Sequence, residues 1–172
     1  LCRNGLSESN FISGQDKFYH FILLAKDEIG HNQLQELSSR AWDRSWMRFI
    51  RRRPTYYSDI EEIIGQNPGH IIASTACIGG FLGTTILKYG ADSKNKSKYQ
   101  QEIIDFLNWC VSIFGEENFF LEMQPSNEEE QVFVNTEIQK ISAAMGIPVI
   151  ITTDAHYLKK EDRKIHKAYL NS

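Results

Sequence analysis

The amino-acid sequence predicts an α/β fold built around a mainly parallel sheet, either closed as a barrel or open. Three observations lead to that class. Short apolar runs rich in branched and aromatic residues alternate with segments whose apolar residues recur at helical spacing. Glycines end several of these segments, where a turn or a helix stop is needed. The 172 residues are 41% hydrophobic and 24% charged, which is typical of one globular domain and excludes disordered, collagen-like and coiled-coil chains.

The first strand is predicted over residues 18–25, FYHFILLA. Its aromatic and branched side chains suit a strand that is buried on both faces. A helix follows, because Asp27 stands at an N-cap position and apolar residues recur at helical spacing up to about Trp42. The chain therefore begins with one strand and one helix.

A second helix and a second strand are predicted before residue 80. The helix lies near residues 58–64 and opens on a capping box formed by Ser58 and Glu61. The strand covers residues 70–77, HIIASTAC, and ends at a pair of glycines, where the backbone is free to turn sharply.

The next helix is predicted over residues 99–114, where six apolar side chains fall on one stripe and Gly115 ends the helix. Residues 118–124 form the third predicted strand. Asn127 is the expected N-cap of another helix, which has three glutamates at the positive end of its dipole and stops at Gly146. Strands and helices thus continue to alternate, as parallel βα units require.

The last strand is predicted over residues 148–153 and the last helix over residues 161–170. Two segments, 41–57 and 90–98, lack an apolar period. The second is polar enough to be expected as a loop.

Charge and cysteine content narrow the functional classes. Lysine and arginine total 19 against 22 acidic residues, so the formal net charge of −3 provides no overall attraction to nucleic acid. The cysteines Cys2, Cys77 and Cys110 form neither a disulfide framework nor a CxxC zinc motif, and a reducing cytoplasm is expected. No apolar run approaches the ~20 residues that span a bilayer, so no membrane partner is expected. The chain begins without methionine, as a fragment would.

Residues able to bind a metal stand in all four predicted strands or directly after them. Asp154 and His156 follow the last strand, and an extended backbone places two such side chains on the same side, about 7 Å apart. Cys77, Glu122 and His20 belong to the other three strands. Carboxylate, thiolate and imidazole groups together suit a divalent ion. The alternative is that the histidine is a hydrogen-bonded core residue and the cysteine a small buried hydrophobe.

Five segments carry a resemblance to a known family. They are YHFILLAK at 19–26, LSS at 37–39, STACIGG at 74–80, FLEMQ at 120–124 and TDAHYL at 153–158. In this order they resemble motifs of the PHP (polymerase and histidinol phosphatase) domain of bacterial and phage DNA polymerase III alpha subunits. The resemblance covers about residues 18–170.

The resemblance implies a distorted (β/α)7 barrel, similar to a TIM barrel, with up to three metal ions at one end of the strands. Residues 1–172 would then be the later βα units of a partial PHP domain, truncated at the N-terminus, because the family's first metal-binding strands precede them. By this resemblance His20, Cys77, Asp154 and His156 are metal ligands, and Glu122 supports them from the surrounding shell. Phe81 stands where many relatives carry a glutamate. Zinc, manganese and iron all suit these ligands.

The function implied by the resemblance is that of a module in a DNA-directed DNA polymerase that acts in replication. The aspartates that synthesise DNA would lie outside this chain, so no catalytic residue is assigned within it. The PHP centre would hydrolyse phosphoesters, including 3'-5' exonucleolytic proofreading. Expected partners are the rest of the polymerase chain, DNA and a proofreading exonuclease subunit. The alternatives are a metal-free structural or docking module, and a stand-alone phosphoesterase acting on a small phosphate such as histidinol phosphate.

Two weaker signals remain. Residues 40–57 carry six arginines and one acid, a local charge of +5, with aromatic residues between them. We expect a nucleic-acid contact at Arg51, Arg52 and Arg53, or else a solvated loop or a surface that packs against the rest of a larger polymerase. A cysteine protease pairing of Cys77 with His156 is disfavoured, because no activated-thiol signature stands nearby.

Overall fold

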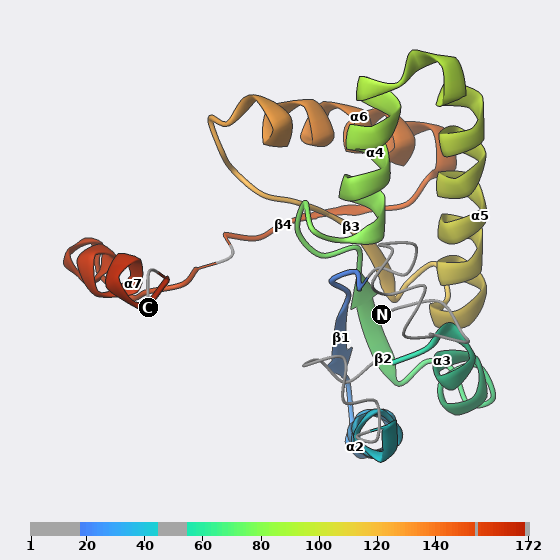
Figure 1. The fold of residues 1–172 in the computed structure, drawn as a ribbon. Helices are drawn as coiled ribbons and strands as arrows, with labels where there is room; N and C mark the ends of the chain where they lie inside the picture. The colour runs from blue at the N-terminus through green and yellow to red at the C-terminus, as the bar shows by residue number, and fades with distance from the viewer. Residues whose placement is uncertain (1–17, 45–54, 154, 171–172) are drawn as a thin grey trace.

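The fold is known from a computed structural model that describes residues 18–44, 55–153 and 155–170 (Figure 1). Within these residues the chain is a mixed α/β structure, as predicted. Its strands and helices, in chain order, are β1 Ile22–Ala25, α2 Glu28–Asp43, α3 Tyr57–Ile63, β2 Ile71–Ser74, α4 Phe81–Ala91, α5 Lys96–Phe114, β3 Phe119–Met123, α6 Glu129–Met145, β4 Val149–Ile151 and α7 Arg163–Leu170.

The four described strands form one sheet in the order β1-β2-β3-β4. The pairs β2–β3 and β3–β4 are parallel, as expected for βα units. Strand β1 departs from this arrangement, because it runs antiparallel to β2, with Ile22 opposite Ser74 and Ala25 opposite Ile71. No pairing between β1 and β4 closes the sheet within the described residues, so the barrel is not confirmed.

The antiparallel pairing follows from where the chain returns to the sheet after α2 and α3. The backbone N–H of Lys26, just past β1, donates to the carbonyl of His70, just before β2, at 2.9 Å. The imidazole of His70 also contacts the carboxylate of Asp27 at 2.7 Å. The end of β1 and the start of β2 are therefore neighbours, and the second strand must run back along the first.

The carboxylate of Asp27 caps α2, as the sequence predicts, by accepting from the backbone N–H of Gly30 at 2.9 Å. The capping box predicted at Ser58 and Glu61 is wrong. Helix α3 has its N-cap at Tyr56, and the carboxylate of Asp59 accepts from the Tyr56 backbone N–H at 2.7 Å. More than one acid in this segment stands where it could accept from the first backbone N–H groups of a helix, and tertiary packing decides at which residue the helix begins.

Helix α4 is absent from the sequence-based expectation, and two glycines explain the omission. Gly83 and Gly90 lower the helix propensity of this segment. Both are needed for packing, since a Cβ at Gly83 would lie 2.8 Å from the backbone of Ile78, and one at Gly90 would lie 2.7 Å from the ring of Phe133. The loop predicted over 90–98 is correspondingly shorter, because α4 ends at Ala91 and α5 begins at Lys96.

The core lies between the sheet and the helices α3, α4, α5 and α6, and Figure 1 shows α4 and α5 side by side. Its fully buried large side chains include Ile60, Ile64, Ile71, Leu82, Ile86, Leu107, Phe114, Phe119, Leu121 and Val134. The apolar stripe predicted for α5 is confirmed, with Ile103, Phe106, Leu107, Cys110 and Phe114 all buried. The removal of these apolar side chains from water is the dominant contribution to the stability of the folded chain.

Strand β1 is not buried on both faces, so that prediction is wrong. Phe21 and Leu23 pack against the core, whereas Ile22 and Leu24 point to the opposite face of β1 and are 40% and 57% exposed. A polar contact also joins the outer helices, where Tyr89 of α4 donates to Glu137 of α6. Burial, together with this contact, raises the pKa of Tyr89 to about 12.

No helix among the described segments has the length and apolarity needed to cross a membrane.

The contact between Asp27 and His70 predicts a pH dependence of stability. The hydrogen bond from His70, helped by the Gly30 N–H, lowers the pKa of Asp27 below its ordinary value. A carboxyl group with a lowered folded-state pKa contributes stability that is present above its unfolded pKa of about 4 and is lost as the pH falls further. His70→Ala is expected to raise the pKa of Asp27 and to flatten the loss of stability between pH 5 and 2. Carbon-detected NMR titration of the carboxyl group, with urea unfolding in parallel, measures both, and an unchanged Asp27 pKa would contradict this account.

Candidate metal centre

A pocket of about 570 Å³ lies at the edge of the sheet where β2, β3 and β4 end and β1 begins. Parallel strands present their carboxyl ends at one edge, and the antiparallel β1 brings its amino end there as well. The residues that line the pocket are Tyr19, His20, Phe21, Ile22, Ala76, Cys77, Glu122, Gln124, Thr152 and His156. Three of the four residues predicted as metal ligands, and Glu122 with them, therefore face one cavity.

His20 and Cys77 are in direct contact. The imidazole Nδ1 lies 3.1 Å from the Cys77 Sγ. Two donors bound to one tetrahedral zinc ion at about 2.0–2.1 Å for nitrogen and about 2.3 Å for sulfur lie roughly 3.5 Å apart. The observed separation is within a few tenths of an ångström of that value, so the two donor atoms fit ligation of a single ion.

The local backbone explains why these residues meet. Ala76 has a φ of 60°, a left-handed conformation that is unusual for alanine and turns the chain sharply after β2. The Gly80 N–H then donates to the Cys77 carbonyl at 2.8 Å and closes the turn. The His20 N–H donates to the Gly79 carbonyl at 3.2 Å, which holds residue 20 beside the turn.

Gly80 lies where three backbone segments approach one another. A Cβ at this position would lie 2.3 Å from the carbonyl oxygen of Thr75, 3.1 Å from that of Cys77 and 3.2 Å from that of His20. The space at residue 80 is therefore available only to glycine. The positions of the His20 and Cys77 side chains depend on this close approach of the three backbone segments.

His156 lines the same pocket from the segment after β4. Its ring centroid lies 5.2 Å from that of His166 in α7, and Tyr157 packs against His166 at 5.7 Å. Asp154 lies outside the described residues. Within the described part of the chain, no three His, Cys, Asp or Glu side chains approach closely enough to hold a metal ion together. The structure thus brings His20 and Cys77 into contact and places His156 at the same cavity without joining it to them.

Glu122 of β3 is only 4% exposed, and hydroxyl and amide groups surround its carboxylate. Oε2 accepts from the Ser74 hydroxyl at 2.6 Å, and Oε1 accepts from the Thr152 hydroxyl at 2.6 Å and from Gln124 Nε2 at 3.2 Å. Sequence reasoning picked out the glutamate but missed these partners. Ser74, Thr152 and Gln124 could not be singled out from the sequence, since each is a common polar residue near a strand end. Only the strand register brings them to Glu122.

The arginine-rich segment is only partly described, and Arg51, Arg52 and Arg53 lie in the undescribed stretch. Arg40 pairs with Glu36 at 2.9 Å and with Glu62 at 2.5 Å. Arg44 pairs with the buried Asp59 at 2.7 Å. The positive charges of Arg40 and Arg44, the two described arginines of this segment, are therefore balanced by acids of α2 and α3.

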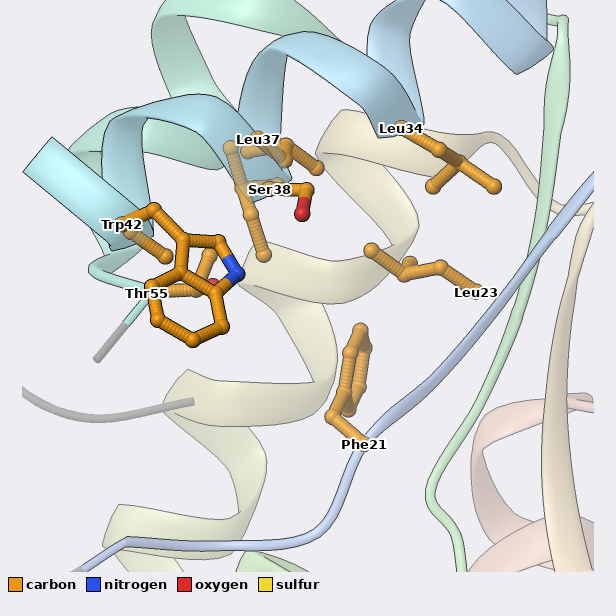
Figure 2. Close-up of a pocket in the computed structure, with 9 residues that line it drawn as sticks. Phe21, Leu23, Leu34, Leu37, Ser38, Trp42 and Thr55 are labelled. Carbon is orange, nitrogen blue, oxygen red and sulfur yellow. The ribbon is translucent and has the colours of Figure 1, made fainter. Parts of the chain in front are cut away.

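A second cavity, of about 360 Å³, lies between β1 and α2 (Figure 2). Figure 2 shows Phe21 and Leu23 of the strand segment facing Leu34 and Leu37 of the helix, with Trp42 at the other end. Among the described residues that line it, the polar side chains are the hydroxyls of Ser38 and Thr55 and the Trp42 indole, and none of these is an acid, a base or a common metal ligand. Of these two cavities, the first is therefore the one that holds candidate metal ligands.

Comparison with known proteins identifies the family. Residues 6–126 match the PHP domain. The chain belongs to the PHP domain family. That match confirms the family predicted from the sequence motifs.

Named relatives are polymerases. The chain is 43% identical over 169 residues to "Probable DNA polymerase YorL" of Bacillus subtilis and, to the same extent, to the "DNA-directed DNA polymerase" of Bacillus phage SPbeta; each alignment covers 95% of this chain and 13% of the relative. It is 33% identical over 159 residues to "DNA polymerase III subunit alpha" of Borreliella burgdorferi, which covers 90% of this chain and 12% of that protein. This PHP chain therefore spans about an eighth of the length of these relatives.

Proposed function

We propose that this PHP domain works as a module of a replicative DNA polymerase of the polymerase III alpha type, in the bacterial cytoplasm. Supporting this, the polymerase relatives align with nearly the whole chain. In this proposal residues 1–172 are the later part of a (β/α)7 barrel, and DNA synthesis is carried by aspartates elsewhere in the polymerase. The remaining polymerase chain and the DNA that it holds are the partners.

We propose further that the pocket at the strand ends binds divalent metal through His20, Cys77, Asp154 and His156. The observation that carries this proposal is the 3.1 Å contact between the His20 Nδ1 and the Cys77 Sγ inside that pocket. Imidazole, thiolate and carboxylate donors fit zinc, manganese or iron. A bound ion of this kind would supply the Lewis acid for phosphoester hydrolysis, and a 3' DNA end is the proposed substrate.

A second function, docking against the rest of the polymerase, is favoured by helix α7. Ile165, Tyr169 and Leu170 are 67–76% exposed, and Figure 1 shows the helix standing apart from the sheet and its other helices. Apolar side chains exposed together on one short helix are typical of an interface. This role is compatible with metal binding, and the proposed proofreading subunit is a further candidate for docking.

Bound-metal stoichiometry tests the metal proposal. Elemental analysis is made on the full polymerase chain, as wild type and with Asp154→Ala, after loading with zinc or manganese and gel filtration. We expect bound metal in the wild type and a loss of at least one ion per chain in the variant. Asp105→Ala, at an exposed position of α5, is the matched control and should keep the wild-type content. A wild type without bound metal would refute the metal site and leave the docking role.

A further inference from the structure

The ends of β2 and β4 are joined by one buried carboxylate that lies between them. Glu122 sits in β3, the strand between β2 and β4, and it receives the hydroxyl of Ser74 on one side and that of Thr152 on the other, each at 2.6 Å. Its own backbone N–H donates to the Thr75 hydroxyl at 2.9 Å. Three adjacent strands are therefore linked through a single residue.

The positions of these hydroxyls tie the link to the candidate ligands. Ser74 is the last residue of β2 and stands three residues before Cys77. Thr152 directly follows β4 and stands two residues before Asp154 and four before His156. Each strand end that the carboxylate holds thus continues directly into a segment that carries proposed metal ligands.

The turn between Ser74 and Cys77 needs such support. Ala76 is held at a φ of 60°, a conformation that persists in a non-glycine residue only when its surroundings fix it. The hydrogen bonds of Ser74 and Thr75 to Glu122 fix the two residues that precede the turn. Without them, the position of the Cys77 sulfur beside His20 would be less well defined.

The negative charge of the Glu122 carboxylate also favours a metal ion in the pocket. Glu122 lines the pocket, and the side-chain groups that donate to it, two hydroxyls and one amide, are all neutral. A buried carboxylate without a paired cation is costly, and a divalent ion in the adjacent pocket offsets that cost. The same residue therefore orients the ligands and favours a cation over an anion beside them.

We propose that Glu122 is a positioning residue of the metal centre, which holds the segments that carry Cys77 and His156 in place through Ser74 and Thr152. This inference rests on the proposed metal site. Groups that orient metal ligands typically change metal affinity by 10–100-fold when removed. Glu122→Gln keeps the size of the side chain and removes its charge and one acceptor.

The test is a titration of the metal-free full polymerase chain with Co²⁺, followed through the thiolate charge-transfer absorption of Cys77. Glu122→Gln is expected to raise the dissociation constant for Co²⁺ about 10–100-fold and to shift the absorption band. Asp59→Asn is the matched control. Asp59 is also a buried carboxylate, 3% exposed, but it holds α3 and Arg44 instead of the pocket, so the variant should bind Co²⁺ within about twofold of the wild type.

The outcomes separate the two proposals. If the wild type takes up no Co²⁺, the metal site itself is refuted. If the wild type binds and Glu122→Gln binds equally well, or if Asp59→Asn weakens binding to the same degree, the positioning role is overturned. Where Glu122→Gln does not fold, Ser74→Ala and Thr152→Val replace it. Each removes one hydroxyl contact, and each should raise the dissociation constant at least severalfold, with wild-type affinity in both contradicting the inference.

Discussion

Gly80→Ala is expected to lower the free energy of unfolding by about 3 kcal/mol, at the upper end of the range for forced overpacking. The added Cβ would lie 2.3 Å from the Thr75 carbonyl oxygen and close to the carbonyls of Cys77 and His20. All three obstacles are backbone atoms, which cannot move aside as a flexible side chain can. The backbone φ of Gly80 is −71°, so the cost arises from contact and not from backbone conformation. Urea unfolding of the variant measures the loss.

Gly79→Ala is the matched control for this effect. Its Cβ would come no closer than 3.4 Å to any atom, and the nearest atoms belong to the side chains of His20 and Cys77. This variant should unfold within about 0.5 kcal/mol of the wild type, as is usual for substitutions that make no clash. Equal stability of the two variants would show that the approach of three backbone segments at Gly80 is not as the structure describes it.

Cys77→Ser is expected to abolish the thiolate–Co²⁺ absorption and to weaken metal binding more than about 100-fold, since loss of a ligand should exceed the 10–100-fold effect of losing an orienting group. The reason is that the Sγ lies beside the His20 Nδ1 at the spacing of two ligands of one ion. Serine keeps the size of the side chain but replaces the soft sulfur donor. Absorption and equilibrium dialysis of the full chain give the two measurements.

Cys110→Ala distinguishes ligation from a general effect of cysteine removal. Cys110 is fully buried in α5, and burial raises the pKa of its thiol, so it stays a neutral core group. The variant should lose some stability through the missing sulfur and keep the cobalt absorption unchanged. An absorption band that survives Cys77→Ser, or disappears with Cys110→Ala, would place the thiolate ligand elsewhere.

Local sequence pattern was sufficient to predict most of the fold, because most of its helices and strands depend on local signals. The Asp27 cap and the apolar stripe of α5 are both visible over a few turns of chain. Helix α4 was missed because its glycines serve tertiary packing, against Ile78 and Phe133, which propensity does not register.

Local sequence pattern also could not predict that β1 lies at the edge of the sheet and runs antiparallel to β2. The residues that fix them, Asp27 and His70, are 43 positions apart. An apolar run such as FYHFILLA is equally suited to a central strand, so its exposure at an edge became clear only from the sheet order.

The candidate site, like the fold, could be predicted only in part. The convergence of Cys77 and His156 on one cavity could be predicted, because the carboxyl ends of parallel strands meet at one edge. His20 stands at the amino end of β1 and reaches the same edge only because β1 runs antiparallel to β2. The hydroxyl contacts of Glu122 could not be predicted, since Ser74 is 48 residues away and Thr152 is 30 residues away. Serine and threonine are too common in strands for either to stand out without the register.

Anomalous diffraction from crystals soaked in zinc, with data collected on both sides of the zinc absorption edge, tests the central claim most directly. We expect a zinc peak in the pocket at about 2.3 Å from the Cys77 Sγ and about 2.0–2.1 Å from a ring nitrogen of His20. A map with no zinc peak there, while His20 and Cys77 remain in contact, would contradict the metal centre on which the proposed function depends.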